Sequence, residues 1–178
     1  MFKTTAITAF TTMTLCYSMF ASAEADMLQL AQRAALQNAQ SGFDRYLGAW
    51  SGSVDARNTV QDVFEERAHI ELTLTDRPEW TVRIDGTTAI AEYVETMHAV
   101  GGQWTFSNVH YYPTMQPGIV FAQFDATGNG HSFSNLVVIE LEGNQIVRLR
   151  DFNAASLLLQ NVLTVGRSDS QPSRVARY

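Results

Sequence analysis

The sequence contains a single cysteine and a single lysine, Cys16 and Lys3, and both lie near its N-terminus. Beyond them, the chain offers no disulfide, no thiol nucleophile and no cysteine ligand for a metal. The lack of lysine also excludes a Schiff base, a pyridoxal-phosphate anchor and a Walker A phosphate loop. The other basic residues are dispersed arginines against 18 acidic residues, and with a net charge of −6 we expect no nucleic-acid partner.

Several catalytic and ligand-binding sequence motifs are absent as well. The four histidines, at positions 69, 98, 110 and 131, are scattered and form no HExxH pattern, so we expect no metal site. No Gly-x-Ser-x-Gly elbow is present, which disfavours a serine hydrolase. The turn at Gly128-Asn129-Gly130 lacks the flanking pattern of a phosphate loop. These absences disfavour a metal site, a serine nucleophile and a phosphate loop.

The N-terminus has the three parts of a secretory signal peptide. Lys3 is followed by an apolar, hydroxyl-rich stretch from Ala6 to Phe20, which ends in the small residues Ala21-Ser22-Ala23. This stretch is shorter and more polar than the roughly 20 apolar residues of a permanent membrane span. We predict cleavage after Ala23 and a secreted or periplasmic location; an uncleaved amphipathic N-terminus is the alternative.

The rest of the chain reads as one domain, residues 24–163, followed by a Ser- and Arg-rich tail, residues 164–178, that we expect to be disordered. Apolar residues at three- and four-residue steps predict a helix from Ala25 to Trp50, with a possible break at Gly42. Shorter helices are expected over Val54–Phe64, and from Thr87 or Thr88, as the N-cap, to Val100. Gly101-Gly102 would end the last of these.

Alternation of apolar and polar residues predicts strands for most of the remaining chain. The expected strands span Arg67–Thr75, Trp80–Ile84, Trp104–Tyr112, Gly118–Ala126, His131–Glu142 and Gln145–Asn153. Glycine-rich turns separate the last three, which favours consecutive hairpins, and a short helix is expected through Val162. The pattern predicts an α+β fold, with three helices packed on one face of a strongly curved antiparallel sheet.

Three stretches of sequence carry a resemblance to a known family. They are Val60–Glu66, Asp85-Gly86 followed by Ile90 and Tyr93, and a terminal hairpin with Phe133-x-Asn135, Glu142–Ile146 and Arg150–Asn153. Together they resemble the SnoaL-like branch of the nuclear-transport-factor-2-like superfamily. The terminal hairpin is similar to that of phenazine-biosynthesis A/B-type proteins, with Asp151 in place of their Glu.

The resemblance implies a cone-shaped barrel with a pocket between the sheet and the helices. It also implies acid–base chemistry on a small apolar molecule, of the kind seen in ketosteroid isomerases, polyketide cyclases and dehydratases. Members of the family usually need no cofactor and are often homodimers. Other members only bind ligands.

Strand parity gives candidate site residues independently of the family. In the last strand Val147, Leu149, Asp151 and Asn153 share one face, and Arg148 and Arg150 share the other. The apolar pair should face the helices, which would carry Asp151 inward, where burial raises the pKa of a carboxyl toward that of a general acid or base. Alternatively, Asp151 pairs with Arg148 or Arg150 at the rim.

Two further strands supply candidate binding residues. His131, Phe133 and Asn135 share a face. Asn135 binds a substrate oxygen or holds Asp151 in place; alternatively, it is a satisfied buried amide. Trp104, Phe106, Asn108, His110 and Tyr112 share a face of an earlier strand, where His110 is either an acid–base partner or a rim residue.

We therefore expect a cofactor-free isomerase, cyclase or dehydratase that acts on a small apolar carbonyl or hydroxyl compound. Asp151 and His110 are the candidate catalytic residues, and Asn135, Phe133, His131, Trp104 and Tyr112 are candidate substrate contacts. A non-catalytic protein that binds a hydrophobic small molecule, and a dimeric interaction module, are the alternatives.

Overall fold

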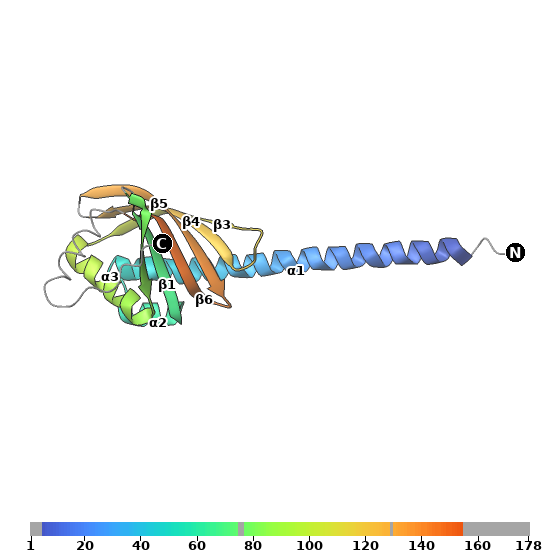
Figure 1. The fold of residues 1–178 in the computed structure, drawn as a ribbon, viewed down its shortest axis with the longest axis horizontal. Coiled ribbons are helices and arrows are strands. Elements are labelled where there is room, and N and C mark those ends of the chain that lie inside the picture. Colours follow the sequence, from blue (N-terminus) through green and yellow to red (C-terminus); the bar gives the residue numbers. More distant parts are fainter. Residues whose placement is uncertain (1–4, 75–76, 129, 155–178) are drawn as a thin grey trace.

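The computed structural model describes residues 5–74, 77–128 and 130–154 (Figure 1). Its elements follow the expected order of two helices, two strands, a helix and four strands. They are α1 (Thr5–Trp50), α2 (Ala56–Val63), β1 (Phe64–Leu74), β2 (Arg77–Asp85), α3 (Thr87–Gly101), β3 (Thr105–Pro113), β4 (Ile119–Gly128), β5 (His131–Glu142) and β6 (Gln145–Ala154). The predicted short helix through Val162 and the predicted tail, residues 164–178, lie outside the described residues.

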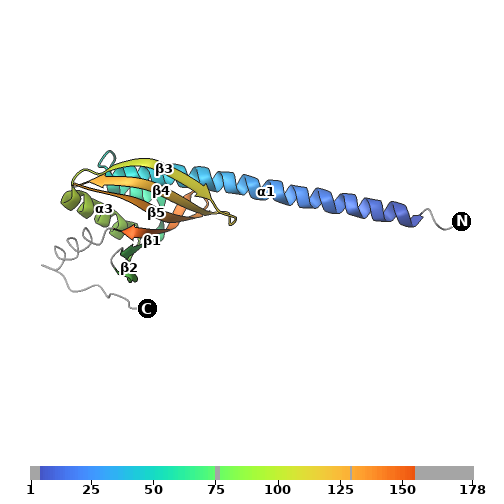
Figure 2. The same ribbon diagram turned by 90° about the horizontal axis from the view of Figure 1, so that it is seen from above.

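The strands form one six-stranded sheet in the order β2-β1-β6-β5-β4-β3. Strands β4, β5 and β6 pair as consecutive antiparallel hairpins, as the turn sequences indicated, and β3 pairs antiparallel with β4. The pairing of β1 with β6 is parallel, so the sheet is mixed rather than wholly antiparallel. Curvature brings the helices against one face of this sheet (Figures 1 and 2).

The α+β class is confirmed, but the sheet is not a closed barrel. The strands β2 and β3 are its two edges and do not pair with each other. Strand β6 pairs with β1 in the interior of the sheet, so it does not join the two edge strands into a barrel.

Helix α1 is longer than the sequence pattern predicted and is continuous through Gly42. It begins upstream of Ala25, and its N-terminal part projects away from the rest of the domain (Figures 1 and 2). At Gly42 a Cβ would lie 3.4 Å from Val63 and 3.8 Å from Ile146. The glycine therefore marks a close approach between α1, α2 and β6 rather than a break.

Local capping explains where the short helices begin. Asp55 caps α2, because its Oδ1 accepts a hydrogen bond from the backbone N–H of Asn58 at 2.7 Å. The N-cap of α3 is Gly86, not Thr87 or Thr88, since the chain turns there with a φ of 82° that glycine adopts most readily. Gly102, with a φ of 70°, ends α3 as expected.

The core lies between the helices and the concave face of the sheet. Strand β4 illustrates how the sheet contributes to this core. Its residues alternate between buried and more exposed positions, because successive side chains of a strand point to opposite faces. The largest fully buried side chains come from every layer and include Phe43, Phe64, Ile70, Ile90, Trp104 and Ile139. This arrangement leaves the concave face of β4, β5 and β6 pointing at α1 and α3.

Candidate active site

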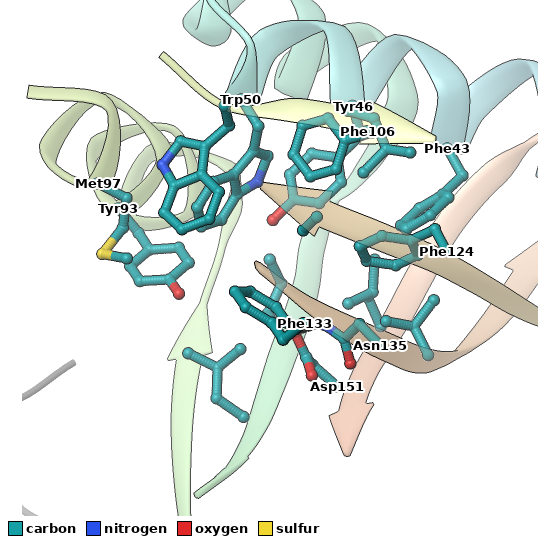
Figure 3. A pocket seen from close by; sticks show the side chains of 17 residues that line it. Phe43, Tyr46, Trp50, Tyr93, Met97, Phe106, Phe124, Phe133, Asn135 and Asp151 are labelled. Atoms are coloured by element: carbon teal, nitrogen blue, oxygen red, sulfur yellow. Dashed lines mark hydrogen bonds between the residues drawn. The ribbon is translucent and has the colours of Figure 1, made fainter. Parts of the chain in front are cut away.

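A pocket opens between α1, α3 and the concave face of the sheet (Figure 3). The helices contribute four aromatic residues to its lining: Phe43, Tyr46, Trp50 and Tyr93. The sheet side contributes four more: Trp104, Phe106, Phe124 and Phe133. The lining also includes Asn135 and Asp151, and about 70 Å³ is free for the centres of water molecules. The site is thus an aromatic pocket with a small polar side.

Asp151 faces this pocket from β6, as strand parity predicted. Its neighbour across the β5–β6 pairing is Val137, and both residues line the pocket. The parity argument needs one correction, because the β5–β6 register shifts after Glu140, so that Ile146, not Val147, is the buried residue below Leu149. That shift lies upstream of Asp151 and leaves its inward direction intact.

Asn135 holds the carboxylate of Asp151 in place. The Asn135 side chain is only 5% exposed, and its Nδ2 donates a hydrogen bond to Asp151 Oδ2 at 3.0 Å. Its Oδ1 accepts the backbone N–H of Leu136 at 2.8 Å. Because the amide oxygen is engaged by the backbone, the amide nitrogen is directed at the carboxylate. Asn135 is therefore both a satisfied buried amide and the residue that orients Asp151.

Two of the candidate binding residues, Trp104 and Phe133, also line the pocket. Their rings lie 6.0 Å apart at 68°, an edge-to-face contact. A Cβ on the buried Gly128 would come within 2.6 Å of the Trp104 ring, so this glycine leaves room for the indole. The pocket wall at this end depends on Gly128 having no side chain.

His110 and Tyr112 do not face the pocket, so the predicted shared face of β3 is wrong. The β3–β4 register shifts between Ser107 and His110, where Asn108 has a positive φ of 52°. The extra residue of this bulge reverses the parity of the strand. Beyond it Tyr111 packs against the pocket residue Phe43, while His110 and Tyr112 are exposed on the opposite face.

His110 instead belongs to a polar group on the outer face. Ser134 and Asn108 donate hydrogen bonds to the two oxygens of Asp125. These bonds, with a smaller electrostatic contribution from His110, lower the pKa of Asp125. The remaining candidate, His131, begins β5, and its side chain lies outside the described part of the structure.

Two tyrosines in the pocket were not among the sequence candidates. Tyr46 of α1 is 4% exposed, and Tyr93 of α3 lines the same space. Burial is the main cause that raises the pKa of both phenols, and the charge of Asp151 adds to it in each case. A hydrogen bond with the Trp50 side chain opposes the rise in the pKa of Tyr46. Both phenols therefore stay protonated and can donate hydrogen bonds.

The sequence carried only a weak signal for these tyrosines. Both fall on the apolar faces of their helices, where a tyrosine is usually a core residue. Only the fold brings α1 and α3 together above Asp151. Figure 3 shows Tyr46, Trp50 and Tyr93 on the helix side of the pocket and Phe133, Asn135 and Asp151 on the strand side.

Arg148 and Arg150 lie on the opposite face of the sheet from Asp151. Both donate to Glu71 Oε2 at 2.8 Å, from Arg148 Nη2 and Arg150 Nε. Arg148 also reaches Glu140 at 3.2 Å. Strand parity predicted that the two arginines share the face opposite Asp151, and their ion pairs lie on that convex side.

Within residues 5–74, 77–128 and 130–154 no three His, Cys, Asp or Glu side chains are grouped as a metal ion would need. The helices of the same ranges include none that is long and apolar enough to cross a membrane.

No family model and no curated protein matches this sequence. Solved structures do match. One is a proposed isomerase from Bacillus subtilis, 20% identical, with a TM-score of 0.58 over 73% of this chain and 95% of the other. A phenazine biosynthesis-related protein from Pseudomonas aeruginosa is 20% identical, with a TM-score of 0.52 over 79% and 94%. A protein of ketosteroid isomerase-like fold from Catenulispora acidiphila, in complex with trimethylamine, is 14% identical, with a TM-score of 0.53 over 67% and 89%.

These similarities establish the fold. The matching structures include ketosteroid isomerase-like, polyketide cyclase and phenazine biosynthesis-related proteins. The chain therefore has a nuclear-transport-factor-2-like fold, as the three sequence stretches indicated.

Proposed function

We propose that this protein is a cofactor-free acid–base enzyme of isomerase, cyclase or dehydratase type, of the SnoaL-like branch of its fold. Its substrate would be a small carbonyl or hydroxyl compound bound in the aromatic pocket. The observation that carries the proposal is the placement of an oriented carboxylate opposite two protonated phenols in an apolar setting.

The chemistry follows from this arrangement. Asp151 would take a proton from the carbon next to the substrate carbonyl and return it at another position. As negative charge develops on the carbonyl oxygen, the phenols of Tyr46 and Tyr93 would donate hydrogen bonds to it. Asn135 would keep the carboxylate directed at the substrate through its 3.0 Å hydrogen bond.

The test is deuterium exchange next to the carbonyl of small ketones, followed by NMR in D₂O. The full chain should accelerate exchange for at least one ketone that binds. Asp151→Asn should slow that exchange by about 10²–10⁴, the usual contribution of a general base. Asp125→Asn, on the outer face, is the matched control and should exchange at the wild-type rate. No acceleration for any ketone that binds would contradict the proposal.

A non-catalytic binding protein is the second candidate. It is favoured by the eight aromatic residues in the lining and by the trimethylamine bound to the protein of the same fold from Catenulispora acidiphila. Native mass spectrometry of protein purified from its own source would identify a ligand that travels with it.

The proposal places the enzyme outside the cytoplasm, after cleavage behind Ala23, and as a homodimer. N-terminal sequencing of exported protein should begin at or near Glu24, and protein that keeps a lipid-modified Cys16 would contradict cleavage. Sedimentation equilibrium would decide between dimer and monomer.

A further inference from the structure

The aromatic rings of the pocket stand at steep angles to each other. Trp50 lies 5.4 Å from Tyr93 at 76° and 6.4 Å from Trp104 at 85°. Tyr46 meets Trp50 at 83°. Rings that meet nearly at right angles are not stacked, so no parallel neighbour covers their faces. An uncovered ring face attracts a cation, because it carries the negative part of the quadrupole.

The charge of the lining favours a cation as well. Asp151 contributes a carboxylate to the pocket, and Asn135 fixes its orientation. The 17 side chains drawn in Figure 3 include no arginine, lysine or histidine. A cationic guest would therefore meet attraction from the carboxylate and no like charge in this lining, whereas an anion would be repelled.

The size of the pocket sets a limit on the guest. About 70 Å³ is free for the centres of water molecules. An engineered cavity of roughly 150 Å³ in another protein holds one benzene molecule. The space here is about half of that, so it would take the compact trimethylammonium head of a guest, with any longer arm directed toward the opening of the pocket.

We infer that the pocket binds a small methylated ammonium cation, with its methyl groups among the rings of Trp50, Tyr93 and Trp104 and Asp151 as the counter-charge. The inference uses the pocket of the proposed function and names its ligand class. It needs binding alone and does not depend on catalysis.

Choline and its neutral isostere 3,3-dimethylbutan-1-ol give a matched test, since they share their shape and differ in charge. Binding to the full chain is measured by calorimetry and by the fluorescence of the pocket tryptophans. Choline should bind at least about tenfold more tightly than the isostere, which is the scale of a desolvated cation–π contact with a counter-charge. Equal or tighter binding of the isostere would overturn the inference, as would no choline binding at about 10 mM.

Two variants locate the site. Asp151→Asn should weaken choline binding about tenfold or more and leave the isostere nearly unchanged, because only the charge is lost. Trp50→Leu should weaken choline binding more than isostere binding, and its melting curve shows whether it folds. Asp125→Asn removes a carboxylate from the outer face and should leave both ligands unaffected. Equal loss of choline binding in Asp125→Asn would indicate a general surface charge effect and overturn the inference.

The outcomes separate this inference from the proposed function. If the protein exchanges protons on a neutral ketone but shows no preference for choline, the proposed enzyme activity is supported and the cation site is refuted. If it binds choline selectively but exchanges protons on no bound ketone, the cation site is supported and the proposed activity is refuted.

Discussion

Asp151 and Glu71 lie on neighbouring strands, yet the two carboxylates are held in opposite ways. Asp151 faces the aromatic pocket and accepts a hydrogen bond from an amide, Asn135. Glu71 faces the convex side, where Arg148 and Arg150 each donate to it and His69 lies 3.4 Å away. The amide donor brings no charge to the carboxylate that accepts from it, whereas two guanidinium groups place positive charge beside theirs. The sheet thus separates a carboxylate that faces the pocket from one that is held in ion pairs on the other side.

The largest expected effect is the contrast between Asp151→Asn and Glu71→Gln. Asp151→Asn should reduce ketone proton exchange by about 10²–10⁴ and leave the melting temperature equal or higher, since burying a charge is costly. Glu71→Gln should lower the free energy of unfolding by about 1–3 kcal/mol, because two partly buried arginines lose their partner, with exchange unchanged. Denaturant unfolding and NMR exchange measure both. A large stability loss in Asp151→Asn with exchange intact would mean that Asp151 is the structural carboxylate.

The next effect concerns the wall of the pocket. Gly128→Ala places a Cβ 2.6 Å from the Trp104 ring, so the ring or the strand must move. We expect a loss of about 1–3 kcal/mol in the free energy of unfolding and a change in tryptophan fluorescence. Gly130→Asn is the control, because nothing lies within 4 Å of its Cβ position and asparagine tolerates a positive φ. Similar losses in both variants would refute the packing explanation.

The next prediction compares the loss of a phenol hydroxyl inside the pocket, in Tyr46→Phe, with the same loss outside the pocket lining, in Tyr111→Phe. Removing the Tyr46 hydroxyl should slow exchange by about tenfold to a hundredfold, through loss of one donor to the developing oxyanion. Tyr111→Phe removes a hydroxyl that donates to Asp44 at 2.5 Å, outside the pocket lining, and should leave exchange unchanged. Equal rates for Tyr46→Phe and wild type would remove Tyr46 from the proposed mechanism.

The smallest effect is an acid dependence on the outer face. The hydrogen bonds from Ser134 and Asn108 lower the pKa of Asp125 below its ordinary value of 3.8, so the folded state favours the charged form. The resulting stabilisation is present above that value and is lost as the pH falls through the lowered pKa of the folded state. The stability difference between wild type and Asp125→Asn should therefore shrink from about pH 5 to about pH 2. A difference that stays constant over this range would contradict the assignment.

Much of the fold could be predicted because its signals are local. The alternation in β4 and the glycine stop at Gly102 depend on residues near each other in the chain, as does the direction of Asp151 within β6. The same logic failed at His110, because one extra residue at Asn108 reverses the parity of β3 and only the pairing with β4 shows it. The N-cap of α3 was misassigned for a related reason, since a backbone turn at Gly86 replaced the expected threonine side chain.

The sequence by itself determined the α+β class and the direction in which Asp151 points from its strand, because period-two alternation decides which face a strand residue occupies. The tertiary structure decided that β1 pairs in parallel with β6, that Asn135 binds Asp151, and that Tyr46 and Tyr93 converge on the same pocket. These contacts join residues far apart in the chain, and no local pattern records which distant surface will cover an apolar face.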